Sequence, residues 1–338
     1  MGKRGWAMAI VAVGLTLAAG STVAAGGGRA PATASAGALP RLGPPDGVEY
    51  DDVGDPFVMT VPPGSGRPGR YMLFWTTDWQ SNVPTAVSAD LRHWTRVADA
   101  LPVLPSWAEP SFSLTWAPAA QAVPGGWVLY YSTEDAALQV ECIGAAFSIE
   151  PTGPYTDSSP RPLVCQPDVG GSIDPSVVRA ASGPVRYLVW KNDGNAAGRP
   201  SAIWEQQLTG DGLGLTGPVH RLLGATQSWE DGIVEGPAML AAGHGGYWLF
   251  FSGGRWQSTT YGTGVWWCQT VSGPCRATRP GPFLASSRGV VSPGGFDTFT
   301  DLSGRLWASW SAFPSAPPDA RAAMAENRVL EIAPVLSH

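Results

Sequence analysis

The chain has 338 residues, enough to bury a core in one large domain or two smaller ones. Glycine (43 residues) and proline (32) are abundant and charged residues make up only 14%. Together with 16 tryptophans in short apolar stretches, this favours short aromatic strands joined by turns over a helical fold. The formal net charge of −6 makes nucleic acid and anionic membranes poor partners and suits a neutral substrate.

The first residues have the pattern of a secretory signal. Lys3 and Arg4 precede an apolar run of roughly 14 residues, which ends in small residues such as Val23 and Ala25. The alternative is a membrane anchor, which needs roughly 20 apolar residues. Cleavage near Ala25 would remove two positive charges and take the net charge from −6 to −8. We therefore predict a signal over 1–25, a flexible linker over 26–45, and a secreted protein with no membrane attachment after cleavage.

A proline recurs at nearly even intervals along the rest of the chain. Pro56, Pro118, Pro175 and Pro237 are separated by 62, 57 and 62 residues, and a fifth unit falls near residue 297. Each position is followed by a short turn and an aromatic strand, at 69–77, 125–133, 184–193, 245–253 and 304–312. Further strand–turn–strand stretches follow at 84–97 and 144–157. A unit of about 60 residues with this content is typical of a propeller blade.

The sequence thus predicts an all-β fold, a five-bladed β-propeller with four-stranded antiparallel blades around a central channel. It would occupy 46–338 as one domain, with the terminal stretch 327–338 returning to the first blade as a closing strand. A β-sandwich with appended modules is the alternative, and it fits the even period less well.

Four cysteines in an exported chain are expected to pair. The local pairings Cys142–Cys165 and Cys268–Cys275 are preferred, because the second pair needs only a short Gly-Pro turn between its sulfurs. Free core cysteines are the alternative. The spacing matches no zinc site.

Acidic residues precede three of the recurring prolines. Asp55, Asp174 and Glu235 stand at the start of the first strand in units one, three and four. That strand lines the channel of a propeller, so the three carboxylates would converge although each one alone would be an ordinary turn residue. Convergence is electrostatically costly and indicates function. Glycosidic bond cleavage needs a protonated acid and an ionised carboxylate on the other side of the sugar, and a third carboxylate beside the acid can raise its pKa and fix its orientation.

The stretches "DDVGDPFVM", "TWAPA", "GGSIDPSVV" and "IVEGPAML", in this order and at this spacing, resemble the catalytic segments of glycoside hydrolase family 43. The resemblance runs from about Tyr50 to Phe313. It implies a five-bladed propeller that cleaves arabinose- or xylose-containing plant polysaccharides with inversion. It also implies that Asp55 is the general base, that Asp174 tunes and orients the acid, and that Glu235 is the general acid.

Within this family, the segments around Cys165 and Cys268–Cys275 look most like members acting on α-L-arabinofuranosyl units. An exo-acting arabinofuranosidase is therefore expected, with an endo-arabinanase or a β-xylosidase as alternatives. A propeller that binds glycans without turnover is the competing class. No cofactor is expected, and the partner would be a neutral oligo- or polysaccharide bound by a monomer.

One segment departs from the family pattern. Many members carry a histidine in the fifth blade, within "GPGH", that can support an ion on the channel axis, whereas this chain reads "SPGGFDTF". None of the four histidines lies at a recurring position. We predict no histidine-supported metal, and any calcium in the channel would be structural.

Aromatic residues near the recurring positions are candidates for stacking on a sugar face. They are Trp116, Trp75, Trp190 and Trp256, although blade packing is the alternative for each. Arg255 could donate hydrogen bonds to sugar hydroxyls, and solvent exposure is equally compatible with its position.

Overall fold

The computed structural model describes residues 41–42, 46–48, 52–64, 68–78, 80–110, 114–243, 245–315 and 327–336. The signal predicted over 1–25 lies outside this range. The described chain forms five antiparallel sheets, three of four strands, one of three and one of five. Helical structure within it is limited to three single turns, η1 (Pro167–Val169), η2 (Gly194–Ala197) and η3 (Ser228–Glu230). A helix that could span a membrane is not found in the part of the chain that the structure describes.

Each sheet is one blade, and the blades follow the chain in order. Blade one contains β3 (Phe57–Val61), β4 (Arg70–Phe74), β5 (Thr85–Ser88) and β6 (Trp94–Arg96). Blade two contains β7 (Trp116–Val123), β8 (Gly126–Asp135) and β9 (Val140–Ser148). Blade three contains β10 (Ser172–Arg179), β11 (Arg186–Asn192), β12 (Ala202–Leu208) and β13 (Leu215–Gly224). Blade four contains β14 (Val234–Ala241), β15 (Tyr247–Gly253), β16 (Gly262–Cys268) and β17 (Cys275–Ala277). Blade five contains β18 (Val291–Thr300), β19 (Leu306–Phe313), β20 (Val329–Leu336), β1 (Arg41–Leu42) and β2 (Asp46–Val48).

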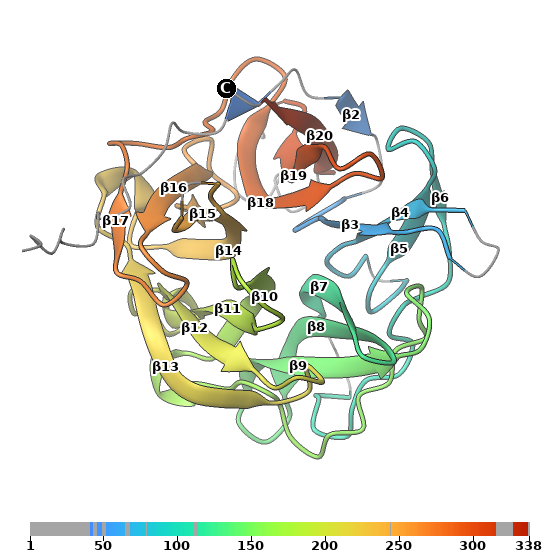
Figure 1. Cartoon of the computed structure of the whole chain (residues 1–338). Helices are drawn as coiled ribbons and strands as arrows, with labels where there is room; N and C mark the ends of the chain where they lie inside the picture. The colour runs from blue at the N-terminus through green and yellow to red at the C-terminus, as the bar shows by residue number, and fades with distance from the viewer. Residues whose placement is uncertain are drawn as a thin grey trace, which may run out of the picture. The chain divides into compact units, whose positions relative to one another are not determined.

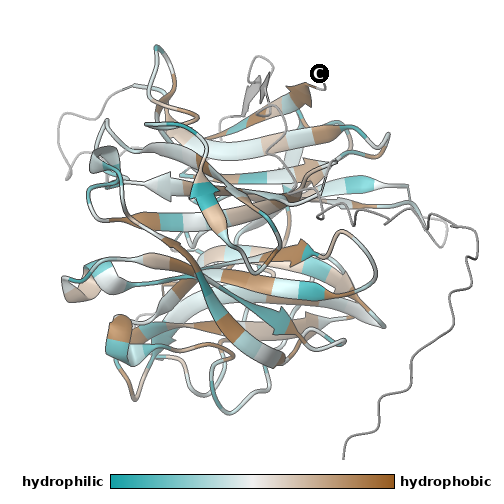
Figure 2. Ribbon diagram, turned by 60° about the vertical axis from the view of Figure 1, so that its left-hand side comes forward, coloured by the Kyte–Doolittle hydropathy of each residue, from teal (hydrophilic) through white to brown (hydrophobic). Residues whose placement is uncertain are grey.

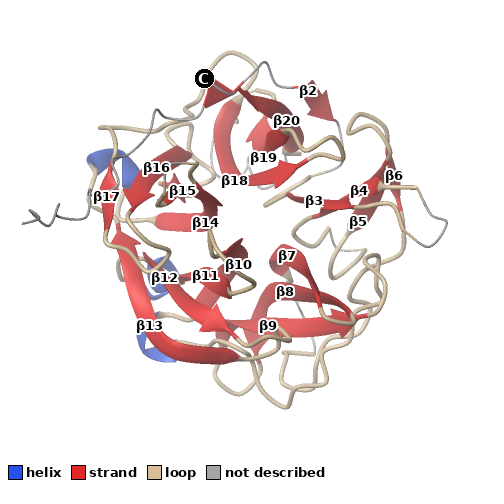
Figure 3. Ribbon diagram, in the orientation of Figure 1, coloured by secondary structure: helices blue, strands red, loops and turns tan. Residues whose placement is uncertain are grey.

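The blades close into a ring. The innermost strands β3, β7, β10, β14 and β18 each contact the next, and β18 contacts β3. Figure 1 shows these five strands around a common axis, with the later strands of each blade farther out. Figure 3 shows that the short helical turns lie outside the inner strands. The five-bladed propeller predicted from the repeat is therefore confirmed.

The ring closes differently from the prediction. Strand β20 does not return to blade one but pairs with β19 as the third strand of blade five. The strands β2 and β1 then pair with β20 on its other side, so the segment before blade one completes the last blade. Strand β1 falls within the segment 26–45 that the sequence analysis assigned to a linker.

Blade two also differs, because it has three strands in place of four. The segment after β9 pairs with that strand as two isolated β-bridges, Phe147–Thr156 and Ile143–Val164, and forms no continuous strand. Prolines 151, 154, 160 and 162 interrupt this segment, and proline cannot donate to a strand ladder. The predicted disulfide Cys142–Cys165 joins the segment to β9, and the predicted Cys268–Cys275 joins β16 to β17.

The core lies within and between the blades. All seven residues of β15 are buried, because neighbouring blades cover both faces of this strand. Its Phe251 lies opposite Gly264 of β16, where any side chain would overlap the phenyl ring. Tyr131 and Gly144 repeat this arrangement in blade two. Figure 2 shows hydrophobic residues recurring along the strands of successive blades.

Candidate functional site

The start of the inner strand has the same unusual backbone in every blade. The five residues at the structurally equivalent position, each directly before a recurring proline or Phe296, have positive φ angles: Asp55 (50°), Ala117 (45°), Asp174 (57°), Gly236 (53°) and Gly295 (62°). In blades two to five the pairing register shifts at this point. Non-glycine residues adopt this conformation at a cost and often at functional sites. Asp55 and Asp174 occupy the equivalent position, whereas Glu235 lies one residue before it.

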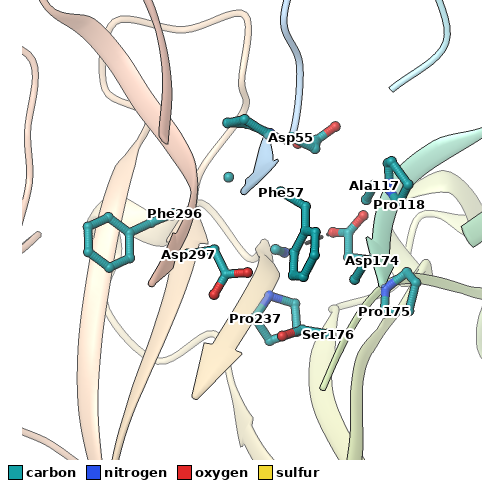
Figure 4. A pocket seen from close by; sticks show the side chains of 14 residues that line it. Asp55, Phe57, Ala117, Pro118, Asp174, Pro175, Ser176, Pro237, Phe296 and Asp297 are labelled. Atoms are coloured by element: carbon teal, nitrogen blue, oxygen red, sulfur yellow. Dashed lines mark hydrogen bonds between the residues drawn. The ribbon is translucent and has the colours of Figure 1, made fainter. Parts of the chain in front are cut away.

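These segments surround a cavity of about 40 Å³ on the channel axis. Its lining includes Asp55, Asp174 and Asp297 together with Pro118, Pro175 and Pro237. Figure 4 shows the three aspartates arranged around this space, with prolines from neighbouring blades between them. The repeat therefore brings together residues that are far apart in the sequence.

Asp55 is held by groups from two other segments. The Thr76 hydroxyl donates to Asp55 Oδ2 at 2.7 Å and accepts the Ala117 N–H at 3.0 Å. Burial raises the pKa of Asp55, while the Arg328 charge and the Thr76 hydrogen bond oppose that rise. The charge of Glu235 adds to the rise in the pKa of Asp55.

Asp174 is bound to the backbone that carries Glu235. Its Oδ2 accepts the Gly236 N–H at 2.8 Å, and its own N–H donates to the Ser132 hydroxyl at 3.1 Å. Burial raises the pKa of Asp174 to about 8, with further contributions from the charges of Glu235 and Asp55 and against the opposing charge of Lys191.

Glu235 has a separate partner on each carboxyl oxygen. Lys191 Nζ donates to Oε2 at 3.0 Å, and the Tyr261 hydroxyl donates to Oε1 at 2.7 Å. The Lys191 side chain is 1% exposed and also pairs with Asp193 at 3.3 Å. Burial alone would lower the pKa of Lys191, but the charges of Glu235, Asp174 and Asp193 raise it above its ordinary value, so the amine stays charged.

Arg328 approaches Asp55 from the segment before β20. Its Nε donates to Asp52 Oδ1 at 3.0 Å, and its guanidinium lies 4.9 Å from the centre of the Trp256 ring. Gly54 leaves room for this guanidinium, because a side chain there would overlap it. Trp256 also stacks on Phe313, with ring centres 6.4 Å apart. Trp256 therefore supports Arg328 beside the carboxylates.

The prediction that tryptophans stack on a sugar is wrong for two of the four residues. Trp75 is 0% exposed and Trp190 is 1% exposed, so both rings belong to blade cores and cannot meet a sugar. Trp190 Nε1 donates to Gln166 Oε1 at 2.7 Å. Trp116 is half-buried at the start of β7, directly before Ala117. Arg255 is exposed and pairs with the equally exposed Asp231 at 3.1 Å.

Within the described range, no three His, Cys, Asp or Glu side chains are grouped to hold a metal ion. His93 and His220 each face a carboxylate, Asp90 and Glu205, at 2.7 Å. His244 and His338 lie outside the described residues.

The sequence analysis missed Thr76, Lys191, Tyr261, Arg328 and Asp297. Of these, Asp297 could have been found, because it follows the fifth recurring position at an equivalent place in the channel. Thr76 and Lys191 lie in the recurring strands at 69–77 and 184–193 but were not recognised there, whereas Tyr261 comes from the loop before β16 and Arg328 from the segment before β20.

The comparisons with known proteins agree with this fold. The family model "Glycosyl hydrolases family 43" matches residues 51–335. A search of curated proteins found no match.

Many solved structures have a similar fold. An α-L-arabinofuranosidase from Lactobacillus brevis has a TM-score of 0.64 and 15% identity, with 83% of this chain and 90% of that chain covered. An endo-arabinase from Bacteroides thetaiotaomicron has a TM-score of 0.65 and 19% identity, with coverage of 86% and 99%. An endo-1,4-β-xylanase from the same organism has a TM-score of 0.66 and 22% identity, with coverage of 86% and 96%.

Proposed function

Because the chain belongs to glycoside hydrolase family 43, a family of inverting glycosidases, we propose that Asp55, Asp174 and Glu235 form its catalytic set. The observation that supports this most directly is that Asp55 and Asp174 line the same axial cavity and that Asp174 accepts the N–H of Gly236, the residue directly after Glu235. Asp55 is the general base, Glu235 the general acid, and Asp174 the residue that orients and tunes the acid.

The proposed reaction is a single displacement with inversion. Glu235 donates its proton to the glycosidic oxygen as the bond from that oxygen to the anomeric carbon breaks. A water on the opposite face attacks this carbon and gives its proton to Asp55. The Thr76 hydrogen bond fixes the Asp55 carboxylate for this transfer, and Arg328 stabilises its negative charge.

Asp174 acts on the acid mainly through the backbone. Its carboxyl accepts the N–H of Gly236, the residue directly after Glu235. This contact fixes the start of β14 and so the direction of the Glu235 side chain. Its proximity to Glu235 also supports the tuning role.

The substrate we propose is an arabinose-containing plant polysaccharide, cleaved from its end as by an α-L-arabinofuranosidase. The support is the resemblance around Cys165 and Cys268–Cys275, together with the arabinofuranosidase and arabinanases among the similar structures. A β-xylosidase or an endo-arabinanase is the second candidate, favoured by the xylosidase and endo-acting enzymes in the same group.

Hydrolysis by the purified mature protein would test this proposal. The substrates are debranched arabinan, arabinoxylan, and the aryl arabinofuranoside and xyloside, with Asp55→Asn as the inactive control. We expect wild type alone to release arabinose monomer. Xylose would indicate a xylosidase and longer products an endo-acting enzyme, while saturable binding without turnover would indicate a binding module.

Replacement of the acid tests the roles themselves. We expect Glu235→Gln to lower activity on polymer by about 10²- to 10⁴-fold, because a sugar is a poor leaving group that needs the proton. Activity on an aryl glycoside with an acidic phenol should fall far less. Equal losses on both substrates would contradict the assignment of Glu235 as the acid.

We further propose that the protein acts outside the cytoplasm as a monomer. The two disulfides support an oxidising compartment, and the pattern of residues 1–25 supports export.

A further inference from the structure

Tyr261 reaches the site from outside the recurring segments. It lies in the loop between β15 and β16 and is 6% exposed. Its ring packs over Gly294 of β18, where a side chain would overlap the ring. Because Gly294, in the unusual "SPGGF" segment, has no side chain, it leaves the space that the Tyr261 ring occupies. The hydroxyl that this packing fixes lies 2.7 Å from Glu235 Oε1.

The two partners of Glu235 differ in what they can do. Lys191 is an ammonium, which has hydrogens to donate and no lone pair to accept. Oε2 is therefore favoured as an acceptor whether or not Glu235 carries a proton. A phenol can donate or accept, so the proton of Glu235 is best placed on Oε1, beside Tyr261.

Ser252 is a second possible acceptor for the hydrogen of the Tyr261 hydroxyl. Ser252 is 0% exposed, and its hydroxyl oxygen accepts the Gly295 N–H at 3.0 Å. Ser252 Oγ and Tyr261 Cζ, the carbon that bears the hydroxyl, both border the space at Gly294, and Ser252 is one of the groups that act on the Tyr261 hydroxyl. Burial raises the pKa of Tyr261 well above its ordinary value, with contributions from Glu235 and Asp55, so Tyr261 keeps its own proton.

We propose that Tyr261 is a positioning residue that holds the catalytic proton on Oε1 of Glu235 and stabilises the carboxylate left after its transfer. While Glu235 is protonated, the Tyr261 O–H points to Ser252 and its oxygen faces the Oε1 hydrogen. In the reaction the Oε1–H bond breaks, an O–H bond forms on the leaving oxygen, and the electrons of the O–H bond stay on Oε1. The Tyr261 hydroxyl then turns to donate to Oε1. This inference rests on the proposed role of Glu235 as the acid.

The test compares Tyr261→Phe with wild type on aryl glycosides of increasing leaving-group pKa and on polymer. The variant keeps the ring over Gly294 and removes only the hydroxyl. A hydrogen bond to a charged group is worth a rate change of about 10- to 100-fold, so we expect kcat on polymer to fall by that factor. We expect KM to be nearly unchanged and the most activated aryl substrate to lose less than about 3-fold.

Two further variants make the outcome decisive. Tyr130→Phe removes another buried tyrosine hydroxyl, bonded to Gly212 O at 2.7 Å in blade two, and should show no dependence on the leaving group. Ser252→Ala should give a smaller loss in the same direction as Tyr261→Phe, and it serves as the test if Tyr261→Phe does not fold.

The results separate this inference from the proposed function. If Glu235→Gln shows the leaving-group dependence and Tyr261→Phe loses activity equally on all substrates or not at all, the role of Tyr261 is wrong and that of Glu235 stands. If Glu235→Gln shows no such dependence, both assignments are overturned.

Discussion

Asp297 is a carboxyl group in the channel that the proposed reaction does not use. It lies on β18 and lines the axial cavity. Burial raises its pKa to about 7, opposed by a hydrogen bond from the Thr298 N–H at 2.7 Å. Its ionisation therefore affects the stability of the ring.

The pKa of Asp297 is 3.8 in the unfolded chain and about 7 in the folded protein, and this difference decides how pH changes the free energy of unfolding. Below pH 3.8 the carboxyl is protonated in both states. Between pH 3.8 and about 7 the unfolded chain releases the proton while the folded chain keeps it, so the free energy of unfolding falls as pH rises. Above about pH 7 both states are ionised and the loss stays constant.

Asp297→Asn should remove this penalty. We expect its melting temperature to equal that of wild type near pH 4 and to exceed it by a few degrees at pH 8, since 1 kcal/mol corresponds to roughly 2–4 °C in proteins of about 150–250 residues and to less in a longer chain. Calorimetry of both proteins across this range is the measurement. A variant that is less stable at pH 8, together with a wild type that a chelator destabilises, would instead indicate a cation beside Asp297.

At the residue scale, the sequence could predict the carboxylates and not their partners. Asp55 and Asp174 are recognisable because each directly precedes a recurring proline, and Glu235 lies one residue earlier. Lys191 and Arg328 become neighbours of these carboxylates only when the blades close into a ring. The predictions for Trp75 and Trp190 were wrong because the sequence does not show whether an aromatic ring on a strand faces the channel or the core between blades.

At the scale of elements, blade two shows where a disulfide takes the place of a strand. Cys142–Cys165 holds the proline-rich segment beside β9, where a continuous fourth strand is missing. Cys268–Cys275 joins two strands that already pair with each other. The first bond spans 23 residues and the second only 7, so the first bond restricts the unfolded chain more.

Removal of the two disulfides should therefore have different effects. We expect Cys142→Ser with Cys165→Ser to lower the free energy of unfolding by about 3 kcal/mol, and Cys268→Ser with Cys275→Ser to lower it by about 2 kcal/mol. Urea denaturation of both double variants provides the comparison. Equal stability of the first variant and wild type would mean that the bridges of Thr156 and Val164 hold the segment without the disulfide.

At the scale of the whole molecule, the number of blades was predictable and the closure was not. Every blade repeats a turn followed by an aromatic strand, and in four of the five blades this strand has seven or more residues. This repeat is visible in the sequence. The closing strands β1 and β2 have only two and three residues. Segments this short have no periodicity to detect, and their pairing depends on the edge of β20, which the ring itself positions.

The closure gives a prediction about the stability of the whole ring. A chain that begins at residue 52 lacks β1 and β2, and so leaves the outer edge of β20 unpaired. A chain that begins at residue 40 keeps both strands and is the matched reference. Because β20 also supplies Leu330 and Ile332 to the core beside blade one, loosening it should weaken the contact between the first and last blades.

We expect the shorter chain to melt several degrees below the reference and to lose activity on heating at a correspondingly lower temperature. The loss of activity should follow the loss of structure, because Arg328 directly precedes β20 and reaches Asp55 from there. Equal melting temperatures of the two chains would mean that the contacts of β18 and β20 with blade one close the ring without the added strands. Calorimetry, with residual activity measured after each heating step, distinguishes the two outcomes.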